Sequence, residues 1–400
     1  MKNILFVGNY PPPYGGIANH LYTLLPDLIK EKYLVTTETI STKNKKIESP
    51  FMLNSYFNLK NYILKNTFTI IINYLKYLKY KRDLPLKEFI KTIVLSSYLS
   101  NQINTKKYDT IFIYSIASGY CIPILKSIFP LKSFNLMIFG DFYKNPNFFK
   151  AQKKYLLSVF DSCKNIMASS AYCGNSVKYL LDKKYPVKVV YIGVDSKLFK
   201  PCDENQNFKP DAELPKNAIV LLFFARMIKI MGLDFVLENY QEILNINPNV
   251  YLVIAGAKGA LSSEVERISK LNKRVIYRPD VSFENKINYF QQTDILLAPT
   301  LENQACMGVA IKEAMACGLP IIASNSGGIP EAINDGEEGF TVSTIKGSID
   351  KTMFIKRIKT LCDNTGLRNG MGKKGREKVL SLFTNESTVE KYINILENDI

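Results

Sequence analysis

The chain is poor in the residues that build metal sites and disulfide frameworks. It has a single histidine, His20, and seven cysteines, an odd number without any C-x-x-C pair. Structural zinc sites use four cysteine or histidine ligands at short spacings, and disulfide-stapled domains usually carry an even number of cysteines. The sequence therefore excludes both a structural zinc and a disulfide framework.

Long apolar runs are also missing. A spanning helix needs about 18–20 apolar residues, and the nearest candidate, Phe68–Ile72, is interrupted by Asn73 and then by Lys76. The amino terminus is apolar only as far as Val7 and has no small-residue cleavage site, so it is predicted to be a first strand and not a signal peptide. We expect a cytoplasmic protein.

Acidic residues are few compared with basic ones. The chain has 52 lysines and arginines against 36 aspartates and glutamates, which gives a net charge of +16. Such a charge favours nucleic acid, anionic lipid headgroups or phosphorylated substrates without choosing among them. We find no recognised nucleic-acid motif and expect no specific nucleic-acid partner, because charge alone supplies only non-specific affinity. The net charge of +16 alone keeps a nucleic-acid-binding protein as a rival hypothesis.

The length and the alternation of patterns predict two domains. A chain of 400 residues that is 46% apolar can form two cores, since single cores stop growing at roughly 250–300 residues. Strand and helix patterns alternate on both sides of a polar segment that contains three prolines. The predicted parts are an N-terminal domain over 1–197, a linker over 198–216, a C-terminal domain over 217–385 and a final helix over 386–400.

The first domain begins with a strand over 3–8, a glycine-rich turn and a helix over 17–31. A region rich in lysine and tyrosine, from about residue 51 to 99, is predicted to be helical. Further predicted strands cover 110–114, 135–139, 165–168, 187–195, 218–225, 250–256 and 274–277.

The most informative stretch runs from Thr300 to Glu331. An apolar strand over 294–299 leads into a loop, a helix opens around Gly308 and ends at Gly318, and a second buried strand follows. This is one βαβ unit, and ligands of such parallel sheets bind outside the carboxyl ends of the strands.

The same stretch resembles the nucleotide-binding half of the retaining glycosyltransferases of family 4. The resemblance rests on Glu-Ala-Met-Ala-Cys-Gly at 313–318 and Gly-Gly-Ile-Pro-Glu at 327–331, and it is sharpest between residues 218 and 342. It implies the GT-B fold, an α/β architecture of two Rossmann-like domains whose parallel sheets face across a cleft. In that family the first domain binds the acceptor, the second binds the nucleotide sugar, and the last helix crosses back to the first.

The resemblance assigns donor-binding roles to several positions. Glu313 would receive the ribose hydroxyls, which suits a carboxylate that accepts two hydrogen bonds near a positive helix end. Its alternative interpretation is a solvent-exposed acid in the first turn of a helix, and the glycines can also be plain tight turns. The other predicted donor-binding residues are Gly15, Gly16, Gly308, Gly327, Gly328 and Glu331.

Arg226 ends an apolar strand and matches the diphosphate-binding arginine of the family. It would pair with phosphate oxygens and neutralise charge on the leaving nucleoside diphosphate, a role that a metal plays elsewhere. The accompanying lysine of the family falls on Met231, and Lys229 is its predicted substitute. The resemblance thus implies no metal and no cofactor besides the nucleotide-sugar co-substrate.

Other positions depart from the family pattern. The sugar-facing acid falls on Ala305, so Glu302 is predicted to replace it, with a simple surface residue as the alternative. Two frequent histidines correspond to Tyr114 and Phe139, and Asp141 is predicted to bind a sugar hydroxyl instead.

The acceptor side is predicted to include His20 and Tyr114. His20 follows the Gly-Gly turn and is the only candidate histidine for a catalytic base. A lone histidine on a helix is equally explained as a packed or surface residue.

The segment 58–82 interleaves basic residues with tyrosine, leucine and isoleucine. This pattern fits a helix resting on an anionic membrane surface, which would make the protein peripheral on the inner face of the cell membrane. It fits equally a helix that packs its apolar side on the sheet and holds its lysines in water.

The resemblance, together with these features, implies a retaining, metal-independent glycosyltransferase. The donor would be a UDP- or GDP-sugar and the acceptor a saccharide or a polyprenyl-diphosphate-linked saccharide, in bacterial surface polysaccharide synthesis. The departures from the family motifs leave one alternative, a catalytically degenerate GT-B protein that binds nucleotide sugar or acts as a scaffold.

Overall fold

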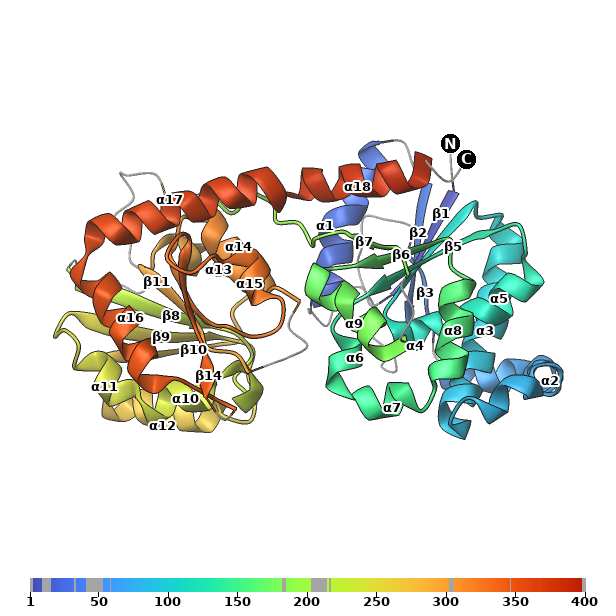
Figure 1. Ribbon diagram of the computed structural model, residues 1–400, viewed down its shortest axis with the longest axis horizontal. Coiled ribbons are helices and arrows are strands. Elements are labelled where there is room, and N and C mark those ends of the chain that lie inside the picture. Colours follow the sequence, from blue (N-terminus) through green and yellow to red (C-terminus); the bar gives the residue numbers. More distant parts are fainter. Residues whose placement is uncertain are drawn as a thin grey trace. The chain divides into compact units, whose positions relative to one another are not determined.

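The computed structural model describes residues 3–8, 16–31, 34–40, 53–57, 59–181, 185–202, 214–215, 217–301, 306–345 and 347–397. The chain divides into two compact units. The first unit comprises residues 1–193 together with 385–400, and the second comprises 194–384. Each unit contains a parallel sheet with helices on its faces, which confirms the predicted α/β architecture (Figure 1).

The sheet of the first unit has the strand order β3-β2-β1-β4-β5-β6-β7, and every pair in it is parallel. The inner strands β1 and β4 are largely apolar, as strands covered by helices on both faces require. The strands are β1 (Asn3–Val7), β2 (Leu34–Ile40), β3 (Leu53–Phe57), β4 (Thr110–Tyr114), β5 (Ser133–Ile138), β6 (Asn165–Ala168) and β7 (Val187–Val189).

The helices of this unit follow the strands in βα alternation. They are α1 (Gly16–Lys30), α2 (Leu59–Lys76), η1 (Leu78–Arg82), α3 (Leu86–Lys106), α4 (Ile116–Gly119), α5 (Ile122–Ile128), α6 (Asp141–Lys144), α7 (Pro146–Lys150), α8 (Lys153–Asp161), α9 (Ala171–Leu181) and α18 (Asn385–Glu397). The prediction that 51–99 is wholly helical is wrong at its start, where β3 pairs with β2 at the sheet edge. The alternating pattern of β3 is only five residues long, too short to be told from a helix by periodicity.

The sheet of the second unit has the order β10-β9-β8-β11-β12-β13 and is also parallel. Its strands are β8 (Ile219–Phe224), β9 (Val250–Gly256), β10 (Val275–Pro279), β11 (Ile295–Ala298), β12 (Ile321–Ser324) and β13 (Gly339–Val342), and a short hairpin follows, β14 (Thr344–Ile345) and β15 (Ser348–Ile349). The strand order reverses between β8 and β11, and doubly wound sheets bind ligands at such a reversal.

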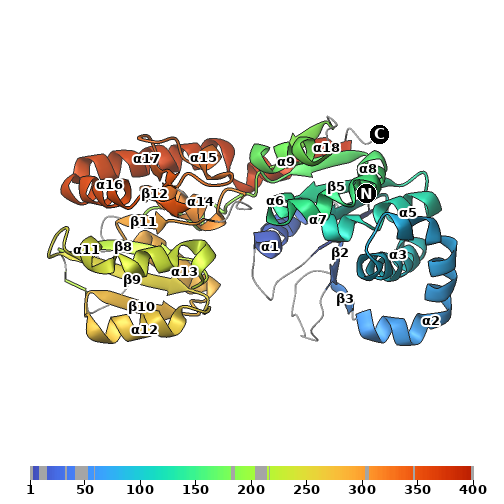
Figure 2. The ribbon, with the colours of Figure 1, turned by 60° about the horizontal axis from the view of Figure 1, so that its bottom comes forward.

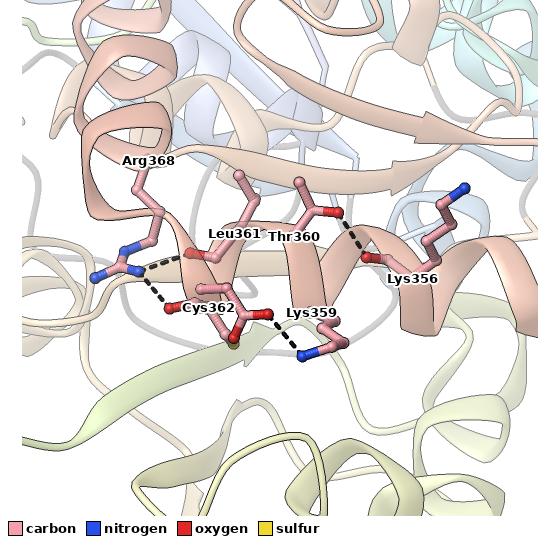
Figure 3. A network of polar contacts seen from close by, with 7 residues as sticks. Lys356, Lys359, Thr360, Leu361, Cys362 and Arg368 are labelled. Atoms are coloured by element: carbon pink, nitrogen blue, oxygen red, sulfur yellow. Dashed lines mark hydrogen bonds and ion pairs between the residues drawn. The ribbon is translucent and has the colours of Figure 1, made fainter.

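The helices of the second unit surround this sheet. They are η2 (Lys229–Met231), α10 (Leu233–Glu238), α11 (Tyr240–Leu244), α12 (Ser262–Leu271), α13 (Phe283–Gln291), α14 (Val309–Ala316), α15 (Ile329–Ala332), α16 (Lys351–Asp363) and α17 (Thr365–Leu382). Helix α16 ends where Arg368 of α17 donates hydrogen bonds of 2.6 and 3.0 Å to the carbonyls of Leu361 and Cys362 (Figure 3). These bonds satisfy carbonyls that a helix end leaves unpaired.

Helix α17 also fastens the start of the second unit. Arg376 donates hydrogen bonds to the carbonyls of Phe199 at 2.6 Å, Ala316 at 2.8 Å and Ser196 at 3.0 Å. The backbone of Val194 donates to Phe383 at 2.8 Å. These contacts hold the chain from 194 to 199 against α14 and α17.

Candidate functional site

Three strand ends meet on one edge of the second sheet. The carbonyl of Ile230 accepts hydrogen bonds from Leu301 N and Thr300 Oγ1, both 3.0 Å long, which tie η2 to the segment after β11. The hydroxyl of Ser324, at the end of β12, donates to the carbonyl of Thr300. The carboxyl ends of β8, β11 and β12 therefore form one connected rim beside the reversal in strand order.

A glycine brings η2 close to β11. Gly232 has a φ of 76°, and a Cβ at this position would lie 1.8 Å from the carbonyl oxygen of Pro299. No side chain fits there, so Gly232 is required for η2 to pack on the residues that follow β11.

Arg226 and Lys229 stand on this rim with exposed side chains. Within the described ranges neither of them takes part in an ion pair. Met231, at the position of the family's lysine, packs against the hydrophobic core of the unit. The local chemistry thus offers two exposed cations, at residues 226 and 229, where ligands of such a sheet bind.

Glu313 lies in α14 and only 4% of it is exposed. Its carboxylate is paired with the ammonium group of Lys286 on α13, whose side chain is 11% exposed. The interpretation of Glu313 as a solvent-exposed acid is therefore wrong. A buried carboxylate needs such a partner, because an unpaired charge is costly to remove from water.

The ammonium group of Lys286 also faces three aromatic rings. Its Nζ lies 5.9, 5.6 and 5.7 Å from the ring centroids of Phe199, Phe224 and Phe290. Such distances permit cation–π attraction, which is strongest where water is excluded. The Lys286–Glu313 pair is thus enclosed by apolar side chains, and sequence reasoning missed Lys286 because it lies in a different helix from Glu313.

A second lysine lies beside this pair. Lys312 is 2% exposed and its Nζ is 5.6 Å from the ring of Phe383. Burial lowers the pKa of Lys312 from 10.5 to about 8, and Cys306 and Glu313 oppose this effect. The sequence could have indicated that Lys312 is unusual, because this lysine interrupts the apolar pattern of a short helix that is buried on all sides.

Two of the predicted glycines, Gly308 and Gly327, occupy positions that need the conformational freedom of glycine. Gly308 caps α14 with a φ of 75°, and a Cβ there would lie 2.9 Å from Ile311 Cδ1. Gly327 has a φ of 57° directly after β12, and Gly328 caps α15. Glu331 is half-buried in α15. The turn at 327–331 therefore follows the strand next to β11, on the same edge as Arg226.

Some predicted site residues lie outside the described part of the chain. These are Gly15, Glu302 and the neighbouring Ala305, while Gly16 is the first residue of α1. Their predicted roles stay predictions.

Asp141 lies at the start of α6, after the carboxyl end of β5 in the first unit. Its Oδ2 is buried and makes no hydrogen bond to the residues described. Burial raises the pKa of Asp141, while a backbone hydrogen bond from Ile116 and the charge of Lys144 act against this rise. The predicted contact with a sugar hydroxyl stays a prediction.

His20 and Tyr114 lie inside the first unit, each 1% exposed. The hydroxyl of Tyr392, on α18, is 3.1 Å from His20 Nε2 and 2.5 Å from the hydroxyl of Tyr114. Burial raises the pKa of both tyrosines. This arrangement fits the packing interpretation of His20, and the acceptor-side role of both residues stays a prediction.

None of the helices in the described ranges is long and apolar enough to cross a membrane.

Comparisons with known proteins give three kinds of similarity. Residues 204–378 match the family described as "Glycosyl transferases group 1". Spore coat protein SA of Bacillus subtilis is 24% identical over 316 residues, which cover 74% of this chain and 80% of that protein. An uncharacterized 41.2 kDa protein in the cps region of Klebsiella pneumoniae is 28% identical over 265 residues, which cover 62% of this chain and 70% of that protein.

Among solved structures, Anabaena HepE in complex with UDP is similar with a TM-score of 0.72 and 15% identity, and the similarity covers 100% of both chains. At this identity the likeness concerns the fold.

Proposed function

Because the chain is a GT-B glycosyltransferase with a glycosyl transferases group 1 match over 204–378, we propose that it transfers a sugar from a UDP- or GDP-sugar with retention of configuration. The observation that carries this proposal is the pair of exposed cations, Arg226 and Lys229, at the strand-order reversal of the second sheet. A site at this edge suits a diphosphate, because an arginine offers planar, paired donors to phosphate oxygens. HepE, which shares the fold, was solved with UDP.

In the proposed reaction the acceptor hydroxyl attacks the anomeric carbon on the face from which the nucleoside diphosphate departs. The bond from that carbon to the diphosphate oxygen breaks, the new glycosidic bond forms, and the proton of the acceptor passes to the leaving phosphate. Arg226 and Lys229 stabilise the charge that grows on the diphosphate, so the proposal needs no metal. Backbone amides of the 327–328 turn are the proposed further donors.

Glu313 is the proposed partner of the ribose hydroxyls, and Lys286 holds its carboxylate in one orientation through their ion pair. Glu302 is proposed to face the transferred sugar, and Asp141 is proposed to bind a sugar hydroxyl. The proposed acceptor is a saccharide or a polyprenyl-diphosphate-linked saccharide of bacterial surface polysaccharide synthesis. The similarity to a protein in a cps region supports that setting.

The first test is a thermal-shift panel with UDP, GDP, ADP and CDP on the wild type and on Arg226→Ala. A ligand that binds only the folded state raises its apparent stability by mass action. Arg226 is exposed, so its removal leaves the fold intact. Loss of a charge-assisted pair costs about 1.5–3 kcal/mol, so we expect affinity for one nucleotide to fall roughly 10- to 150-fold.

The matched control is Arg267→Ala, which removes an equally permanent charge from α12, where Arg267 pairs with Glu264 on the surface. We expect this variant to bind the nucleotide as the wild type does. Equal loss in both variants, or no shift with any nucleotide, would refute the proposed site.

Turnover then separates transfer from binding alone. We expect release of nucleoside diphosphate from the matching nucleotide sugar when an acceptor is added, with an α-linked donor giving an α-linked product by NMR. Binding without turnover over a panel of acceptors would favour the alternative, a degenerate GT-B protein or scaffold.

A further inference from the structure

Helix α2 is oriented against the usual pattern of a helix on a water-soluble protein. It lies at the periphery of the first unit, beside α3, in both views (Figures 1 and 2). The side that faces α3 carries polar and aromatic groups. Asn73 Nδ2 donates a hydrogen bond of 2.7 Å to Ser97 Oγ, and the ring of Tyr74 meets that of Phe89 edge-on at 5.3 Å. Asn73 and Tyr74 of α2 are therefore used in packing against α3.

The opposite side of α2 is apolar and exposed. We call this set the outer face: Leu64, Phe68, Ile71, Ile72 and Leu75, with exposed fractions of 70, 78, 51, 48 and 60%. Phe68, Ile71, Ile72 and Leu75 are spaced three and four residues apart and so lie on one side of the helix, while Leu64 precedes a break in the helical backbone at Asn66. A surface helix normally turns this stripe toward the core, and a contiguous exposed apolar patch marks an interaction site.

The charged residues in the segment that carries the outer face are of one sign. No acidic residue occurs between residues 49 and 82, whereas this segment contains five lysines and one arginine. Lys65, Lys76, Lys79 and Lys81 are exposed on α2 and η1. An apolar stripe bordered by lysines is complementary to an anionic bilayer surface, where acyl chains lie beneath phosphate groups.

We propose that α2 and η1 dock the protein on an anionic membrane, with the outer face at the boundary between headgroups and acyl chains. The four exposed lysines contact lipid phosphates, and α2 lies in the plane of the surface. This docking does not depend on the transfer reaction. It would bring the first unit to the surface where a lipid-linked acceptor resides, and so explains why an apolar face points outward.

The chain contains no tryptophan, so Phe68→Trp introduces a single fluorescent reporter at the most exposed position of the outer face. With vesicles of phosphatidylglycerol and phosphatidylcholine we expect a blue shift of its emission and quenching by brominated acyl chains. The matched control is Leu271→Trp, on α12 of the second unit, where Leu271 is 70% exposed. An emission spectrum of Phe68→Trp that vesicles leave unchanged, or an equal shift in Leu271→Trp, would overturn the proposal.

Two further variants test the two halves of the surface, and both change only exposed side chains, so the far-UV circular dichroism should stay that of the wild type. Lys76→Gln/Lys79→Gln/Lys81→Gln is expected to weaken binding to anionic vesicles roughly 100-fold, since each basic residue near such a surface contributes about fivefold. Ile71→Gln/Leu75→Gln is expected to abolish co-sedimentation. Undiminished binding in either variant overturns the proposal.

A second copy of the chain is the competing occupant of the outer face. Sedimentation velocity without lipid distinguishes the two. We expect a monomer for the wild type and for Ile71→Gln/Leu75→Gln. A wild-type dimer that dissociates in this variant would overturn membrane docking. Transfer to a water-soluble acceptor should be equal in the wild type and the lysine variant, so this test can fail while the proposed function stands.

Discussion

The buried ion pair between Lys286 and Glu313 gives the sharpest prediction for the second unit. Replacing Lys286 by methionine leaves the carboxylate of Glu313, 4% exposed, without its partner. Removing one partner of a buried pair costs about 3–5 kcal/mol. For a unit of this size 1 kcal/mol corresponds to roughly 2–4 °C, so we expect the melting midpoint to fall by about 6–20 °C.

The double variant Lys286→Met/Glu313→Met, with the wild type and the two single variants, completes a double-mutant cycle. It removes both charges and places two flexible apolar side chains among Phe199, Phe224 and Phe290, which already surround the pair. Apolar replacement of a buried pair is often neutral, so we expect the double variant to be more stable than either single variant. Urea and thermal unfolding followed by circular dichroism at 222 nm provide the four free energies of unfolding. If the double variant loses the sum of the two single losses, the pair is not coupled and the reasoning is refuted.

The matched control for this cycle is an exposed pair, Lys270 and Glu266, whose side chains are 73% and 50% exposed. Lys270→Met should leave the midpoint unchanged, because exposed ion pairs contribute little. The double variant also isolates the proposed role of Glu313. It should remain folded but lose the thermal shift that the nucleotide produces in the wild type, and an undiminished shift would exclude Glu313 from the donor site.

Two further predictions concern stability. Burial lowers the pKa of Lys312 from 10.5 to about 8. Between these two pH values the amine of Lys312 is protonated in the unfolded chain and neutral in the folded one, so the stability of the wild type rises with pH. Lys312→Met should therefore be more stable than the wild type at pH 7 by up to about 3 kcal/mol, and a gain that persists unchanged near pH 10.5 in urea titrations would contradict this. Within α17, Gly370→Ala should stabilise the folded protein by about 0.5–1 kcal/mol, because a Cβ at this position meets nothing within 4 Å. Gly372→Ala should cost at least about 2 kcal/mol of stability, because its Cβ would lie 1.8 Å from the carbonyl oxygen of Gly318. If both alanines changed the urea midpoint equally, the close contact between Gly372 and the carbonyl of Gly318 would not explain the need for glycine at residue 372.

The architecture of the sheets could be predicted from the sequence because it depends on local patterns. A run such as 219–224 is apolar at every position, as a strand covered on both faces requires, and Arg226 follows it after one alanine. The position of a residue after a parallel strand places it at the ligand edge without knowledge of any distant contact. Gly308 and the turn at 327–331 are visible for the same reason, because their backbone geometry is set by adjacent residues.

Short strands and strands at the sheet edge could not be predicted as well from the sequence. The strand β3 offers five residues that do not distinguish strand from helix, and only its pairing with β2 decides the matter. The environment of Glu313 likewise depends on α13, because its ion-pair partner Lys286 belongs to another helix.

By itself the sequence determined the composition of each element: parallel α/β units, cations after a strand end, and an α2 segment with an apolar stripe and a positive charge. Only the tertiary structure decided which way these groups point. It turned the stripe of α2 outward by using Asn73 and Tyr74 to contact α3, and it buried Lys286, Lys312 and Glu313. The physical reason is that periodicity defines the faces of a helix, whereas the partner that covers each face comes from elsewhere in the chain.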